Sequence, residues 1–339
     1  MAVLGSNVKT ILDMAKERGP DNKQADIIEM LAQSNEFLTD AVFKEGNLPT
    51  GELAVIRTGL PTTYWRLMNA GVPTSKATSA PVQFNCGMLS ARSHVDIKLA
   101  KLNGDPKKYR ISEAEAFLEA MSQEAASTAF YGSASSPEEF VGLSNTYNAL
   151  SGSANSQNIL SAGGSGSDNT SIWLVGWGER AIHMTYPKGS DGGLMHRDLG
   201  EDDVEDSDGY NYRAYKDLFE WDLGLVVKNW KFAVRIPNID ISDFAALATT
   251  QATTAATFVP KLMGRALARI PSRAGIRLGW YMNRTAASLL EQACAASSSY
   301  VLDVQKGQTQ LGETIYTSGF RGVPIRMVDA LLNTETVVS

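Results

Sequence analysis

Residues 111–132 read ISEAEAFLEAMSQEAASTAFYG, and this stretch carries the most complete set of helix signals in the chain. Ser112 and Glu115 have the spacing of a capping box, in which each side chain bonds to the other residue's backbone N–H. Gly132 offers the left-handed conformation that commonly ends a helix. One side of the helix is lined by residues spaced three or four apart, namely Phe117, Leu118, Met121, Ala125, Thr128 and Ala129. We therefore predict a long helix of about 30 Å, around which the rest of the chain is organised.

Length and composition limit the classes of protein to be considered. The chain has 339 residues, more than single hydrophobic cores usually accommodate, so two or three domains, or one domain with long excursions, are expected. Hydrophobic residues make up 43% and charged residues 20% of the chain, which is typical of soluble proteins rather than disordered or membrane proteins. No apolar run is long enough to span a bilayer, and the first thirty residues lack the hydrophobic centre of a signal peptide. We expect synthesis in the cytosol.

The sequence contains few of the motifs that bind cofactors or perform catalysis. Cys86 and Cys294 are too few for a disulfide framework, and the histidines stand in no metal-binding motif. Gly163, Gly164 and Gly166 are not followed by the Gly-Lys-Ser/Thr of a phosphate loop, so a surface loop is the simpler interpretation. The nucleophile elbow of hydrolases is missing as well. We therefore expect no cofactor, no metal and no catalytic residue.

The densest acidic cluster is DLGEDDVEDSDG, residues 198–209. Its spacing does not fit a calcium loop, because Val204 would stand where the first ligand belongs and Tyr215 where the closing Glu belongs. We interpret the cluster as a solvated surface loop whose charges repel one another. A cation held at a contact between subunits is the alternative.

The segment from residue 172 to residue 241 has the pattern of β-strands. IWLVGW and AIHMTY flank residues 178–180, which predicts a hairpin between two strands. Apolar residues then alternate with other residues at 218–225 and at 230–236, which predicts strands with one buried face.

Helical spacing returns near the end of the chain, at residues 259–270 and 284–296. Cys294 falls within the second of these helices and is predicted to be a small core residue. Alternation at Val323, Ile325 and Met327 predicts a further strand.

The first hundred residues contain two segments of unusual character. Residues 1–50 read as a mostly helical arm, and because short helices are marginal alone, the arm must pack on its own domain or on a neighbouring subunit. Residues 51–106 contain Pro73 and Pro81 among β-branched residues, which suits extended edge strands and loops. A long excursion of this kind is uncommon in a compact domain unless it has a function.

The chain resembles the major capsid proteins of tailed bacteriophages in five successive blocks, which are RTGLPTTYWRLMNAGVP (57–73), CGMLSARSHVDIKLAKLNGD (86–105), AFLEAMSQEAASTAFYG (116–132), GSGSDNTSIWLVGWGE (164–179) and RGVPIRMVDALLNTE (321–335). The resemblance implies an α+β subunit of the Hong Kong 97 type, with a long spine helix, an antiparallel sheet, an extended loop and an N-terminal arm. Some members rearrange the connectivity of this fold. The implied regions are an arm at 1–50, an extended loop region at 51–110, a peripheral domain with the spine helix and β-rich block at 111–242, and an axial-type α/β domain at 243–339.

A subunit of this kind is expected to self-assemble into hexamers and pentamers of an icosahedral head enclosing double-stranded DNA. Scaffold, portal and decoration proteins are further candidate partners, and no membrane is involved. The net charge of -6 disfavours tight binding of phosphate, which suits a shell that encloses DNA without binding it strongly. Aromatic and Arg side chains dominate interface energetics, and the Arg fork can pair with a neighbour's carboxylate. The candidate contact residues are Arg57, Tyr64, Trp65 and Arg66.

Two other classes of protein stay open at this point. One is a metal-dependent enzyme on an α+β scaffold, with the acidic cluster as its metal site. The other is a different virion component, such as a tail or decoration protein.

Overall fold

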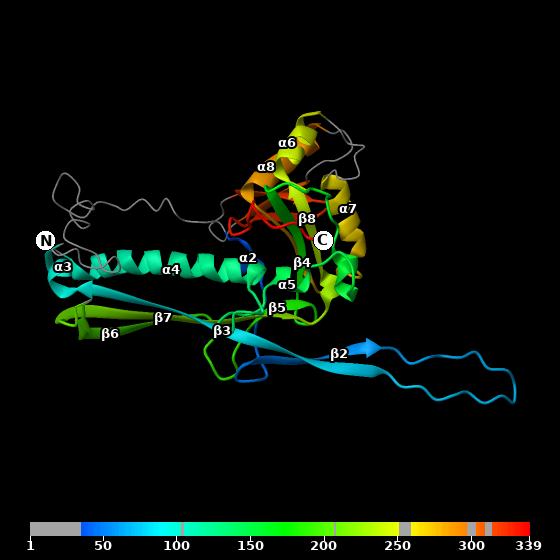
Figure 1. Cartoon of the computed structure of the whole chain (residues 1–339), viewed down its shortest axis with the longest axis horizontal. Coiled ribbons are helices and arrows are strands. Elements are labelled where there is room, and N and C mark those ends of the chain that lie inside the picture. The colour runs from blue at the N-terminus through cyan, green and yellow to red at the C-terminus, as the bar shows by residue number, and fades with distance from the viewer. Residues whose placement is uncertain (1–34, 103–104, 207, 251–258, 297–302, 309–313) are drawn as a thin grey trace. The chain divides into compact units, whose positions relative to one another are not determined.

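The computed structural model describes residues 35–102, 105–206, 208–250, 259–296, 303–308 and 314–339. The chain divides into two compact units. In the described part of the chain, unit 1 comprises Met88–Ala125 and Gly193–Asp222, and unit 2 comprises Asn35–Gly87, Ala126–Gly192 and Leu223–Ser339. The elements that run from one unit into the other are the strands β3 (Thr78–Asp96) and β7 (Asn211–Val227) and the helix α4 (Pro106–Tyr131) (Figure 1). The expected helices before residue 35 lie outside the described residues.

Helix α4 confirms the long helix expected from the sequence, but it begins five residues earlier than expected. Asp105 accepts hydrogen bonds from the backbone N–H groups of Lys107 and Lys108, at 3.0 and 3.3 Å. Pro106 takes the first helical position, where its missing N–H has no partner to lose. The predicted cap at Ser112 is therefore wrong, because Ser112 lies inside the helix.

Gly132 follows the end of α4, but not in the left-handed conformation that the sequence suggested. Its backbone N–H donates to the Thr128 carbonyl at 2.8 Å, and its carbonyl accepts from the Gly142 N–H at 2.9 Å. A Cβ at this position would overlap the carbonyl oxygen of Phe140. The glycine is needed because another segment of backbone approaches closely, not because of its own φ angle.

Unit 1 contains the end of β3, helix α3 (Ile97–Leu102), the first turns of α4, and a hairpin of β6 (Leu194–Glu205) with β7. The expected acidic loop at 198–209 is therefore wrong, because most of it is strand. Cations on β7 lie opposite its carboxylates: Lys216 Nζ is 2.7 Å from Asp202, and Arg213 Nε is 3.7 Å from Asp203. Cross-strand pairs of opposite charge stabilise a sheet.

Arg110 joins helix α4 to this hairpin. Its Nη2 lies 2.8 Å from Asp217, which is almost fully buried, and 2.7 Å from Asp198. The hydrogen bond from Arg110 lowers the pKa of Asp198. Nearby, the ring of Phe219 stacks on Phe117 of α4, with centroids 6.0 Å apart. Charge and aromatic packing together hold the helix on the strands.

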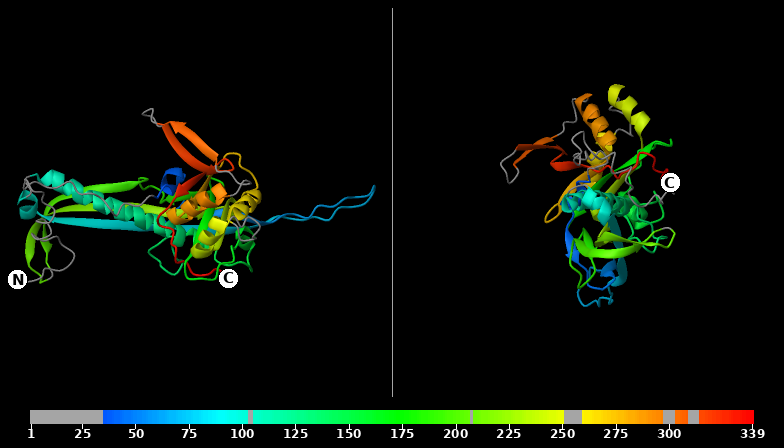
Figure 2. Two further views of the ribbon diagram at one scale, coloured as in Figure 1. Left: turned by 90° about the horizontal axis from the view of Figure 1, so that it is seen from above. Right: turned by 90° about the vertical axis from the view of Figure 1, so that its left-hand side faces the viewer.

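The sheet of unit 2 is built around β4 (Asn169–Trp177), which is buried along its whole length. It runs antiparallel to β8 (Ala233–Asp240) and to β9 (Arg277–Met282). Beyond β9 the order continues with a parallel strand β12 (Val323–Met327) and then the antiparallel strands β11 (Thr314–Phe320) and β10 (Asp303–Gln308). Figure 2 shows β10 and β11 as an orange two-stranded ribbon beside the helices.

The hairpin expected between β4 and β5 (Ile182–Tyr186) is wrong. The two strands share one residue pair, Trp177 with Ile182, and that pair is parallel. Strand β5 instead runs parallel to β1 (Phe43–Glu45) and antiparallel to the end of β7. A short glycine-containing connection therefore does not reveal the pairing here, because both sides of β4 are already occupied by β8 and β9.

Three helices pack on this sheet: α6 (Ile241–Thr250), α7 (Val259–Arg269) and α8 (Arg284–Ala296). The last two and strand β12 confirm the elements expected from the sequence. Their common core includes Leu174 and Ile236 from the strands and Met263, Leu290 and Cys294 from the helices. Cys294 is buried as predicted. The shorter elements of unit 2 are α2 (Phe37–Asp40), β2 (Gly51–Gly59), α5 (Leu143–Thr146), η1 (Ala154–Asn158) and η2 (Trp230–Phe232).

Arg235 of β8 is buried with only 4% of its surface exposed, although the alternating pattern placed it on the outer face of a strand. Its Nη2 lies 2.8 Å from Glu335, its Nη1 donates to the Tyr147 carbonyl at 2.9 Å, and its Nε donates to Ser171 at 3.1 Å. Glu335 also accepts hydrogen bonds from Ser171 and from Tyr131. The prediction of one buried face fails because the C-terminal segment covers the other face.

Removing one member of this buried pair should be costly. We expect Glu335→Ala to lower the free energy of unfolding by about 3–5 kcal/mol, because it leaves the Arg235 charge buried without its partner. The double variant Arg235→Met with Glu335→Leu should recover much of that loss, since apolar side chains of similar size can replace a buried pair. Urea unfolding measures both.

The matched control is Arg284→Ala, which removes an ion pair with Asp329 in which the arginine is well exposed. Its effect should stay below about 1 kcal/mol. A loss of similar size for Glu335→Ala and Arg284→Ala would contradict the role assigned to the buried pair.

Candidate subunit interface

Strands β2 and β3 form a two-stranded ribbon with an open loop between them. The strands pair antiparallel from Gly51 with Asn85 to Gly59 with Thr78. Residues 60–77, called the tip loop here, contain no helix or strand, and Figure 1 shows them continuing the ribbon away from the rest of unit 2. Local hydrogen bonds give the loop some shape: the Ala70 N–H donates to the Leu67 carbonyl at 3.2 Å, and the Ser75 hydroxyl donates to the Thr62 carbonyl at 2.8 Å.

The tip loop exposes large apolar side chains to solvent. Trp65 is as exposed as it would be in an extended peptide, and the exposed fractions of Met68 and Leu67 are 93% and 81%. Leu60 and Val72 are also exposed. Single apolar residues are ordinary on a protein surface, but several large exposed ones in one short loop are typical of a surface that another molecule covers.

The structure places the four predicted contact residues in two locations. Tyr64, Trp65 and Arg66 are neighbours in the tip loop, and all three are exposed. Arg57 lies near the end of β2, two residues before Gly59, and it lines a cleft that also includes Glu52 at the start of the strand. The tip loop and this cleft are therefore two separate candidates for contact with a neighbour.

The root of the ribbon is fixed by close backbone contacts. The Asn47 side chain donates to the Leu53 carbonyl at 2.8 Å and accepts from the Leu53 N–H at 2.7 Å. Gly51 has a φ angle of +144°, and a Cβ there would overlap the carbonyl oxygen of Phe84. Only glycine satisfies both the backbone conformation and this close approach.

A buried polar cluster also holds β2 to the sheet. Glu52 lies 2.7 Å from His183 Nε2 and 2.5 Å from Lys228 Nζ. Burial alone would raise the pKa of Glu52, but hydrogen bonds from Lys228 and His183 outweigh this effect and lower it. Burial lowers the pKa of His183 more than Glu52 raises it. Since a carboxylate only accepts hydrogen bonds, the neutral imidazole carries its proton on Nε2.

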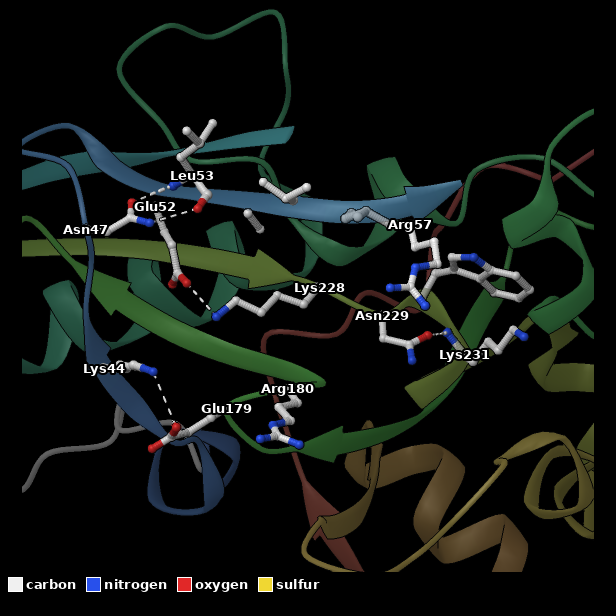
Figure 3. A pocket seen from close by; sticks show the side chains of 14 residues that line it. Lys44, Asn47, Glu52, Leu53, Arg57, Glu179, Arg180, Lys228, Asn229 and Lys231 are labelled. Carbon is white, nitrogen blue, oxygen red and sulfur yellow. Dashed lines mark hydrogen bonds and ion pairs between the residues drawn. The ribbon is translucent and has the colours of Figure 1, made fainter. Parts of the chain in front are cut away.

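Beside this cluster lies a cleft of about 770 Å³, called the basic cleft here. Its charged lining consists of Lys44, Arg57, Arg180, Lys228 and Lys231, with the carboxylates of Glu52 and Glu179 (Figure 3). Lys228 pairs with Glu52, and Lys44 Nζ lies 3.3 Å from Glu179. Within the described residues, neither Arg57 nor Arg180 forms an ion pair. Sequence reasoning missed this cleft because its lining comes from separate segments of the chain.

In the ranges that the structure describes, no group of three or more His, Cys, Asp and Glu side chains is placed to hold a metal ion. None of the helices described is both long enough and apolar enough to cross a membrane.

Comparison with known proteins shows similarity to capsid subunits. The model of the family described as major capsid protein GP7 matches residues 19–339. The chain is 30% identical to a chain in the near-atomic-resolution structure of bacteriophage Epsilon15, with a TM-score of 0.76 and coverage of 100% of this chain and 99% of that one. A capsid chain of an empty GTA particle is 8% identical, with a TM-score of 0.44 and coverage of 69% of this chain and 99% of that one. No curated protein matches.

The continuous long helix, the sheet and the extended ribbon therefore define a capsid subunit with the Hong Kong 97 type of fold, as the sequence resemblance implied. The chain belongs to the major capsid protein GP7 family. It is a structural protein of the virion, a subunit of the icosahedral shell of a phage head.

Acid should weaken unit 2 through the Glu52 cluster. Because both pKa values are lowered by folding, the unfolded chain binds more protons than the folded chain at acid pH. The contribution of His183 to stability is lost as the pH falls below its ordinary pKa of 6.5, and that of Glu52 as the pH falls below its ordinary pKa of 4.5. His183→Gln keeps a donor for Glu52 but removes one titrating group. We expect its free energy of unfolding to fall less steeply between about pH 6.5 and 5. Urea unfolding at several pH values measures this, and an unchanged slope would contradict the role of His183.

Proposed function

We propose that the shell is built from hexamers and pentamers of this chain and that it encloses double-stranded DNA. The observation that carries the proposal is the exposed apolar tip loop on a chain that belongs to a shell-forming family. A closed shell arises from the same contacts repeated between identical copies, so each subunit must offer a surface that another copy covers. The tip loop is such a surface.

The tip loop can contribute binding energy to a contact between copies. Covering one large apolar side chain is worth about 1.5–3 kcal/mol. Trp65, Leu67 and Met68 together therefore supply several kcal/mol for each contact, against which the entropy of ordering the loop must be set. Contacts of this strength, repeated around the shell, close the particle while each single contact stays reversible.

The proposal keeps the division of the chain inferred from its resemblance to capsid proteins. Residues 1–50 act as an arm, 51–110 as the extended loop region, 111–242 as a peripheral domain, and 243–339 as an axial-type domain near the capsomer axis. Phe37 and Asp40, which fall within the arm, pack in unit 2, where Asp40 pairs with Arg326. The part of the arm before residue 35 lies outside the described residues.

The DNA inside the shell and the proposed partner proteins follow from the role of the chain as a shell subunit. The net charge of -6 disfavours tight binding of phosphate, which suits a wall that must let its genome be packed and released. Scaffold and portal proteins are proposed partners, because a closing shell must set its size and admit DNA, and decoration proteins are proposed on its outer surface. The subunit acts without a catalytic residue and is made in the host cytoplasm.

Assembly by the chain itself is the first test. Purified subunit at high concentration should form capsomers or closed shells, which light scattering and electron microscopy detect. Particle mass separates a shell subunit from a tail or decoration protein, because the shell subunit is by far the most abundant protein of the particle. A subunit that stays monomeric at every concentration, with or without other head proteins, would contradict the proposal.

Trp65→Ala tests the contact at the tip loop. Because the side chain touches water in the isolated subunit, the free energy of unfolding should change by less than about 0.5 kcal/mol, whereas the yield of shells should fall. Trp173→Ala is the matched control, since Trp173 is fully buried and its truncation should cost about 3–5 kcal/mol in the isolated subunit. Equal losses of stability and assembly for Trp65→Ala would show that its role is packing alone.

A further inference from the structure

The basic cleft has positive charge that the described residues of its own unit do not neutralise. Its lining contains five basic side chains and two carboxylates. The carboxylates are engaged by Lys44 and Lys228. In Figure 3 the Arg57 side chain points from β2 toward the segment that carries Asn229 and Lys231. Arg57 and Arg180 each offer a planar fork of donors, the geometry that binds a carboxylate through two hydrogen bonds.

A segment of opposite charge lies elsewhere in the chain. Residues 198–209, called the acidic hairpin here, hold seven carboxylates and no Lys or Arg. Glu201, Asp203 and Glu205 occupy alternate positions of β6 and are exposed, so they share one face of the strand at intervals of about 7 Å. Their cross-strand neighbours on β7 are Tyr215, Arg213 and Asn211. Of these three neighbours only Arg213 is positively charged, so there is one cation for the three carboxylates.

We propose that the basic cleft of one subunit binds the acidic hairpin of a neighbouring copy. Carboxylates of β6 pair there with Arg57 and Arg180, and Lys231 adds to the positive field. The contact rests on the proposed assembly of subunits into a shell and gives that assembly its register, because charge complementarity fixes orientation and rejects wrong pairings more than it adds affinity. It is separate from the apolar contact of the tip loop.

A carboxylate-bearing partner fits the cleft better than nucleic acid does. The cleft also includes the apolar side chains of Leu53, Val55 and Trp230, which suit packing against a strand. Its volume of about 770 Å³ accommodates several side chains.

Charge reversal on each side tests the pairing. The cleft variant is Arg57→Glu with Arg180→Glu, and the hairpin variant is Asp203→Lys with Glu205→Lys. Each should reduce shell yield roughly tenfold or more, because like charges then face each other at every contact. All four substitutions in one chain should restore the yield to near that of the unmodified chain. Arg273→Glu and the pair Glu138→Lys with Glu139→Lys are exposed controls outside both surfaces, and they should assemble normally.

Mixing the two variants shows whether the contact joins separate copies. Each variant alone should form few shells. In an equimolar mixture the acidic cleft of one variant meets the basic hairpin of the other, so oligomers containing both chains should appear in native mass spectrometry. Restoration in the fourfold variant without such mixed oligomers would place the contact within one chain and overturn the proposal.

The remaining outcomes separate this inference from the proposed function. If the unmodified chain forms shells and both variants do so equally well, the pairing is wrong while the shell role stands. If the unmodified chain forms no shells, the proposed function itself fails. If the cleft variant assembles normally but binds a double-stranded DNA fragment much less than the unmodified subunit does, the cleft takes phosphate and the proposal is overturned.

Discussion

Toward its tip, the ribbon of β2 and β3 has two faces that no other element covers among the described residues, and this constraint governs the account of the protein. Val55 of β2 and the large apolar side chains of the tip loop are exposed to water in the isolated subunit. Burying them requires another molecule, because no rearrangement of a loop held between two paired strands supplies a second layer. In a chain of a capsid family, the molecule available in the greatest number is another copy.

The same ribbon combines an open tip with a firmly held root. Asn47 and Gly51 fix the backbone where β2 begins, and Glu52 bonds to His183 and Lys228 inside the unit. A rigid root means that binding energy gained at the tip is not spent on ordering the whole ribbon. The buried pair of Arg235 and Glu335 does the same for the C-terminal segment, which it ties to the central sheet. Stability is thus concentrated where the subunit must hold its shape.

The sequence predicted individual elements well and their partners poorly. The long helix, α7, α8 and β12 follow from local spacing, which is a property of neighbouring residues. The start of α4 was misplaced because Ser112 and Glu115 match a capping box by spacing alone, whereas Asp105 and Pro106 make the real beginning. The acidic stretch was misread as a loop because the cations opposite it belong to another strand. Burial of Arg235 depends on Glu335, a hundred residues away, and no local pattern reports that contact.

The residues of the candidate interface also differ in how far the sequence predicts them. Tyr64, Trp65 and Arg66 could be selected because they are adjacent and belong to residue types that dominate interfaces. The basic cleft could not be found, because Lys44, Arg57, Arg180 and Lys231 come together only when four separate segments fold.

Hydrogen–deuterium exchange of the free subunit and of the assembled shell tests the central claim most directly. Amides of the tip loop, residues 60–77, should exchange quickly in the free subunit and become protected in the shell, whereas those of the buried strand β4 should be protected in both. Equal, fast exchange of the tip loop in both states would show that no other copy covers it, and the account of how this chain assembles would be wrong.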